Sequence, residues 1–190
     1  LRGAGYYCTN NSKTDYQFQA PVTVWDESSG KAHWKNRAPG QPFFAVFNFT
    51  GTHEGQAFPS SRRQPQAVAP EKVPLPPFYP DTPAVRDAMA RTYDNIAAMD
   101  RWVGERLEEL KQAKLLDNTI VIFTADHGEM MGSHGRMHKD VWYDESLLVP
   151  FIMRWPARLA PRRDDLLLSV PDIMPTLLNM MQLGEHVPAD

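Results

Sequence analysis

The sequence predicts an α/β fold in which a mostly parallel sheet is flanked by helices. Two strongly apolar runs, at residues 42–49 and 119–126, are separated by a long amphipathic segment, and each run leads into polar residues. Continuous apolar runs of this length are typical of strands buried on both faces of a parallel sheet. The order strand, excursion, long helix, strand is the connection expected between two parallel strands.

The elements up to the second run follow from local patterns. Residues 42–49 read Pro-Phe-Phe-Ala-Val-Phe-Asn-Phe, which predicts the first of the two strands. The proline-rich interval at about 59–83 predicts an irregular surface excursion. Apolar residues then recur every three or four positions, which predicts an amphipathic helix over about 84–114. Asp-Thr-Pro at 81–83 supplies its capping residue and a proline in the first turn.

Two further elements follow the strand predicted at 119–126. Residues 148–155 are apolar again and predict a third strand. A last helix is expected to start near Pro171 and Asp172, with apolar residues at helical spacing after them.

Composition places the chain among ordinary globular domains. Its 190 residues are 42% apolar and 23% charged, which is enough to build a core. The net charge of −3 argues against a nucleic-acid partner, because binding a polyanion rests on clustered Lys and Arg. No apolar run approaches the roughly 20 residues that span a bilayer, so no membrane span is expected. The single cysteine, Cys8, is most simply a small buried hydrophobe.

Asp126 and His127 come directly after the second apolar run. Ligands of open α/β sheets bind at the carboxyl ends of the strands, so this pair predicts a metal site. Gly128 gives the chain the freedom to turn both side chains toward one ion. The pair alone allows a structural role equally well, in which Asp126 caps a turn and His127 is a polar loop residue.

Three more polar residues are candidates for the same site. Lys139 follows the Asp-His pair, and a lysine near a bound cation is explained when an anionic ligand lies between the two charges. This favours an oxyanion substrate. His53, after the first strand, is a candidate general acid because an imidazole can protonate a leaving oxygen near neutral pH. Taken alone, a loop histidine such as His53 is more often merely solvated, and Lys13 would by default be a surface lysine in a polar turn.

Together, these segments resemble the type I sulfatases of the alkaline phosphatase superfamily over nearly the whole chain. The segment carrying Lys13 is similar to the one that holds the family's first active-site lysine, and the segment carrying His53 to the one with its substrate-facing histidine. Asp126, His127 and Lys139 match the calcium-binding strand end and the second lysine. The five matching segments occur in the order 5–13, 47–53, 93–104, 119–139 and 171–178.

The resemblance implies a sulfuric ester hydrolase acting on sulfated carbohydrate. It implies that Asp126 and His127 are ligands of Ca²⁺, or of another divalent cation, although imidazole is a less usual ligand for calcium. Lys13 and Lys139 would hold the sulfate oxygens, and His53 would contact or protonate the bridging oxygen. Relatives often act on external glycans, so a periplasmic or extracellular location is expected.

The nucleophile of this family is a hydrated formylglycine made from a Cys or Ser in the motif Cys/Ser-x-Pro/Ala-x-Arg. That motif is missing here, since the residues after Cys8 fail at the third and fifth positions and Arg62 stands where Ser60 would need Pro or Ala. Residues 1–190 are therefore expected to form the central and later part of a catalytic domain, without the formylglycine segment or the smaller C-terminal subdomain. Alone, they are expected to be inactive.

Other functions remain open at this level. A phosphodiesterase or phosphonate monoester hydrolase of the same superfamily would share the lysine and metal contacts, although it usually needs a second cation. A non-catalytic remnant that kept the fold is the alternative from a different class.

Overall fold

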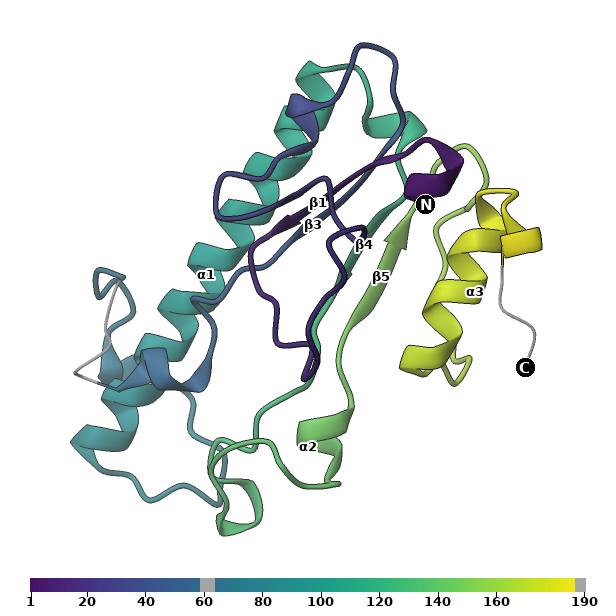
Figure 1. Cartoon of the computed structure of the whole chain (residues 1–190). Helices are drawn as coiled ribbons and strands as arrows, with labels where there is room; N and C mark the ends of the chain where they lie inside the picture. Colours follow the sequence, from purple (N-terminus) through teal and green to yellow (C-terminus); the bar gives the residue numbers. More distant parts are fainter. Residues whose placement is uncertain (59–63, 187–190) are drawn as a thin grey trace.

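The computed structural model describes residues 1–58 and 64–186 (Figure 1). The strands within these ranges are β1 (Tyr7–Asn11), β2 (Glu27–Ser28), β3 (Phe43–Phe47), β4 (Val121–Thr124) and β5 (Phe151–Arg154). The α-helices are α1 (Pro83–Gln112), α2 (Asp144–Leu147) and α3 (Val170–Met180). Short 3-10 helices are η1 (Arg2–Ala4), η2 (Trp34–Asn36), η3 (Glu54–Ala57), η5 (Pro70–Lys72), η6 (Leu116–Asn118), η7 (Ser133–Gly135) and η8 (Gly184–His186).

The described strands form two sheets. β1 lies between β2 and β3 and pairs with both in parallel, whereas β4 and β5 pair antiparallel. In Figure 1, β4 runs in the same general direction as β1 and β3, and β5 runs back. The predicted α/β class with a parallel sheet and flanking helices is therefore confirmed. The third predicted strand adds an antiparallel member, and β3 and β4 belong to separate sheets in the described part of the chain.

Helix α1 confirms the long amphipathic segment. Thr82 caps it, because its hydroxyl accepts a hydrogen bond from the Val85 amide, and proline follows in the first turn. Trp102 packs this helix against the end of β3, with its ring centroid 6.3 Å from that of Phe47 and 5.4 Å from that of Phe49. The strands lie between α1 and α3 (Figure 1).

The proline-rich excursion is anchored on α1 rather than loosely held at the surface. Residues 59–63, where it begins, lie outside the described residues. After them, the carboxylate of Asp94 in α1 accepts hydrogen bonds from the amides of Ala67 and Val68. Val73 is 4% exposed, and its carbonyl accepts a hydrogen bond from Arg86. These contacts replace the backbone pairing that an irregular segment cannot make for itself.

The prediction that the strands are buried on both faces is wrong for the described residues. Every residue of β3 is half-buried, and β4 ends on an exposed threonine. Ile152 of β5 is 60% exposed. Cys8 is buried, as predicted. No helix in the ranges described is both long and apolar enough to cross a membrane.

Candidate active site

The carboxyl ends of β1 and β4 meet at one place. Lys13 follows β1 and Asp126 follows β4, and the Lys13 Nζ lies 2.5 Å from the Asp126 Oδ2. This ion pair raises the pKa of Lys13. Burial alone would raise the pKa of Asp126, but Lys13 and His127 outweigh that effect and hold it below its usual value. An ionised carboxylate therefore faces an ammonium group at this edge of the structure.

The turn at 126–128 presents two electron-pair donors in one direction. The His127 Nδ1 lies 2.8 Å from the carbonyl oxygen of Gly128. Because a carbonyl only accepts, Nδ1 carries the hydrogen and the neutral ring keeps a free lone pair on Nε2. That Nε2 lies 3.6 Å from the Asp126 Oδ2, which also only accepts when ionised. Ligands at roughly 2.3–2.6 Å from a calcium ion can lie this far apart, so the donor set fits a divalent cation.

Gly128 is required by close packing. Its amide donates to the carbonyl of Ser146 at 2.7 Å, which brings two backbone segments together. A Cβ at position 128 would lie 2.0 Å from the carbonyl oxygen of Glu145. The sequence suggested glycine for its conformational freedom, and the structure gives a steric reason for it instead.

His53 and Lys139 form a second pair in which both partners are donors. The Gly55 amide donates to the Nδ1 of His53 at 3.2 Å, so the hydrogen of the neutral ring is on Nε2. The Lys139 Nζ lies 3.0 Å from that Nε2, and a charged ammonium can only donate. Two donors that converge in this way are satisfied by an anionic oxygen that accepts from both. The pair is suited to bind an oxyanion.

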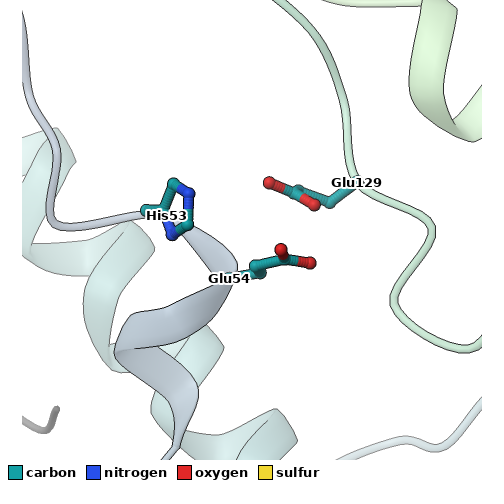
Figure 2. A group of neighbouring side chains, drawn as sticks. All are labelled: His53, Glu54 and Glu129. Carbon is teal, nitrogen blue, oxygen red and sulfur yellow. The ribbon is translucent and has the colours of Figure 1, made fainter. Parts of the chain in front are cut away.

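Glu54, Glu129 and His138 adjoin this pair and were not predicted from the sequence. Figure 2 shows the Glu54 and Glu129 carboxylates facing each other, with the His53 ring beside them. The Glu54 side chain is 7% exposed, and its Oε1 lies 2.7 Å from the Nδ1 of His138. The Glu129 Oε1 lies 3.7 Å from the Lys139 Nζ. A histidine, a buried acid, a half-buried acid and a lysine thus share one small region.

The two carboxyl groups have pKa values that are shifted in opposite directions. Burial alone would raise the pKa of Glu54, but the hydrogen bond with His138 and the contact with Glu129 hold it below its ordinary value. Burial and the adjacent Glu54 raise the pKa of Glu129. Glu54 is therefore the ionised partner, and a proton held by the two acids resides on Glu129.

By spacing alone, His53, Glu54 and Glu129 could hold a metal ion, since one ligand atom from each lies within 4.8 Å of the others. The Lys139 ammonium group argues against this use. It contacts both His53 and Glu129, and it would repel a cation placed among them. Asp126 and His127 are the better candidate ligands.

His134, which lies between the Asp-His pair and Lys139 in the sequence, has a packing role in the structure. Its ring stacks on Tyr143 with centroids 4.1 Å apart, and its Nε2 lies 3.7 Å from a Glu145 carboxylate oxygen. These contacts hold the loop between the Asp-His turn and α2.

Most of the chain matches a known protein family. The family model described as Sulfatase matches residues 5–183. The chain belongs to the sulfatase family. It is 42% identical over 216 residues to an "Ulvan-active sulfatase" of Formosa agariphila, an alignment that covers 95% of this chain and 36% of that protein. It is 46% identical over 99 residues to an "Endo-4-O-sulfatase" of Bacteroides thetaiotaomicron, covering 52% of this chain and 20% of that protein.

A solved structure supports the same assignment of the sulfatase fold. It is a Bacteroides thetaiotaomicron protein labelled 4S-sulf, described with the metabolism of multiple glycosaminoglycans. It superposes with a TM-score of 0.73 at 28% sequence identity and covers 98% of this chain. The chain spans 53% of that structure and about a third of the ulvan-active relative.

Proposed function

We propose that this chain forms the oxyanion-binding and metal-binding part of a sulfuric ester hydrolase that acts on sulfated carbohydrate. The observation that carries the proposal is the 3.0 Å approach of two hydrogen-bond donors, the Lys139 ammonium and the Nε2–H of His53. A sulfate ester offers oxygens that can accept from both. Lys13, at the end of the neighbouring strand, adds a further positive charge for the same group.

Each residue has a distinct role in this proposal. Lys13 and Lys139 hold sulfate oxygens and offset the negative charge that develops as the ester bond breaks. His53 has its Nδ1 engaged by the Gly55 amide, so its Nε2–H is aimed at the ligand and can donate a hydrogen bond to the bridging oxygen. Because Nδ1 is fixed as an acceptor, the ring donates this hydrogen bond from one defined atom.

Asp126 and His127 would hold a divalent cation, for which we propose Ca²⁺. The carboxylate is the hard ligand that calcium prefers, and the Nε2 lone pair of His127 completes the two-donor set. When bound, the cation would supply a fixed positive charge beside the sulfate group and the nucleophile. The Lys13 ammonium group is paired with the Asp126 carboxylate. A cation bound by that carboxylate would repel the ammonium group, so Lys13 would move toward the substrate when a cation binds.

A formylglycine nucleophile is not supplied by the 190 residues, because they contain no Cys/Ser-x-Pro/Ala-x-Arg motif. We therefore infer that a segment with this motif completes the site in the active enzyme. The relatives support a proposal for the substrate and the location. Two of them are named for action on ulvan or for endo-4-O-sulfatase activity, which supports a sulfated glycan as the substrate. Polymeric glycans are found outside the cytoplasm, so we infer a periplasmic or extracellular location.

Paired measurements of binding and turnover test this function. The 190-residue chain should bind an aryl sulfate in the presence of Ca²⁺ and release no phenol from it. A longer protein that joins the chain to the formylglycine segment should hydrolyse the same ester, and Lys139→Met in that protein should lower kcat/KM by roughly 10²-fold or more. Robust hydrolysis by the 190-residue chain would contradict the account of the nucleophile. Preference of the longer protein for a phosphodiester would contradict the proposed substrate.

A further inference from the structure

Glu54 connects the two segments that carry His53 and Lys139. It is the residue after His53, and its side chain is buried with 7% exposure. Both of its oxygens bind residue 138, which directly precedes Lys139. The Oε2 accepts from the His138 amide at 3.1 Å, and the Oε1 lies 2.7 Å from the His138 Nδ1. A buried carboxylate with two bonds to one residue fixes that residue in position and orientation.

The main chain at 138 and 139 is held in a conformation that it would not adopt unaided. His138 has a φ of +70°, in the left-handed region that L-residues rarely enter. Its carbonyl accepts from the amide of Met130, which is 1% exposed. The Lys139 carbonyl accepts from the hydroxyl of the buried Ser146. Buried partners thus fix the backbone from which the Lys139 side chain extends. One of these partners, Glu54, comes from the segment that carries His53.

The pair of contacts requires a carboxylate. The amide and the ring Nδ1–H of His138 are both donors, so residue 54 must present two acceptor atoms. A glutamine of the same shape has one acceptor and one NH₂ group, and the NH₂ would face a donor. It would therefore lose one bond and leave a buried group unpaired.

We propose that Glu54 is a positioning residue that clamps His138, so that Lys139 faces His53 and the two donors bind one anionic oxygen. This inference rests on the proposed function, in which the His53–Lys139 pair binds an oxygen of the sulfate ester. Glu54 itself does not touch the substrate. It acts through His138, and its loss should separate the two donors without removing either.

Calorimetric titration with inorganic sulfate tests the clamp. Glu54→Gln should raise the Kd for sulfate by about tenfold or more, since the two donors no longer converge. Glu109→Gln is the matched control, because Glu109 pairs with His33 at 2.9 Å in the same kind of acid–histidine contact elsewhere in the fold. This control should bind sulfate with wild-type affinity. Equal affinities in wild type and Glu54→Gln would overturn the proposal.

An NMR comparison tests the role of Glu54 without using sulfate. In wild type, Lys139→Met should shift the NMR signals of the His53 ring, because the two side chains are in contact. In the Glu54→Gln background, the same Lys139→Met change should leave those signals almost unmoved. An undiminished response would show that Glu54 does not place Lys139. If wild type fails to bind sulfate, the proposed function falls, while this NMR comparison still decides the role of Glu54.

His138→Asn covers the case in which Glu54→Gln does not fold. Asparagine tolerates a positive φ better than most residues, so the backbone at 138 can be kept while the ring contact is lost. The sulfate Kd should rise by several-fold, and the His53 response to Lys139→Met should weaken. Wild-type behaviour on both measurements would contradict the clamp.

Discussion

The Nζ of Lys13 lies 2.5 Å from the Oδ2 of Asp126, although 113 residues separate them in the sequence. The pair joins the ends of two strands that belong to different sheets. It also sets a proposed substrate-binding lysine directly against a proposed cation ligand. A cation bound by Asp126 would therefore compete with the Lys13 ammonium group for the same carboxylate.

This competition predicts that removing Lys13 strengthens cation binding. Lys13→Met should raise the affinity for Ca²⁺ several-fold, because the carboxylate no longer has an ammonium partner. Both side chains are substantially exposed, so the free energy of unfolding should change by less than about 1 kcal/mol. Calorimetric titration with CaCl₂ measures the affinity. Asp126→Asn should abolish binding, whereas Asp165→Asn at an exposed site should not change it.

Close packing at Gly128 makes a prediction about stability. Gly128→Ala should lower the free energy of unfolding by roughly 1–3 kcal/mol, because the added Cβ would overlap the Glu145 carbonyl. It should also weaken Ca²⁺ binding by displacing the turn that holds Asp126 and His127. Gly104→Ala is the matched control. That position lies within α1 with nothing near its Cβ, so alanine should stabilise the protein by about 0.5–1 kcal/mol. Chemical denaturation distinguishes the two outcomes, and equal effects would refute the steric argument.

Two histidines that are each paired with a glutamate have pKa values shifted in opposite directions. The bond to Glu54 raises the pKa of His138 above its ordinary 6.5. Burial lowers the pKa of His33, despite its contact with Glu109. The His138 contribution to stability is therefore complete below pH 6.5 and is lost as the pH rises through the raised pKa. The His33 contribution is complete above pH 6.5 and is lost as the pH falls through the lowered pKa.

NMR titration of the ring protons measures both pKa values. In Glu54→Gln, the His138 value should fall toward 6.5, and in Glu109→Gln the His33 value should fall further. Urea denaturation above and below pH 6.5 should show that Glu54→Gln removes the His138 part of the pH dependence. A His138 pKa that does not respond to Glu54→Gln would contradict the ion pair.

Local patterns predicted the apolar strands, the long helix and its cap, because hydrophobic spacing and capping depend on residues that are close together in the sequence. They did not predict β1, in which Thr9 and Asn10 are buried polar residues. Asn10 is satisfied by bonds to the Lys13 carbonyl and to Asn48, which come from the folded arrangement. A hydrophobicity pattern carries no sign of such a strand.

Some residues of the candidate site were likewise predicted from the sequence, and others were not. Polar residues after predicted strands identified His53, Asp126 and His127 as candidates, and the family resemblance identified Lys13. In the fold, Asp126 contacts both Lys13 and His127, and His53 contacts Lys139. Glu54 and His138 gave no local signal, because their contact spans 84 residues. Pairing between distant polar residues depends on the tertiary structure, so a single sequence does not reveal it.

The most direct test of the central claim is the affinity of the 190-residue chain for inorganic sulfate, measured in the presence of Ca²⁺, in variants that each lose one donor. Lys139→Met, His53→Ala and Lys13→Met should each raise the Kd by roughly tenfold or more, the loss expected for a hydrogen bond to a charged group. Lys111→Met, at an exposed lysine near the end of α1, should leave the Kd unchanged. Sulfate binding that is absent in wild type, or equally strong in all four variants, would contradict the assignment of this site.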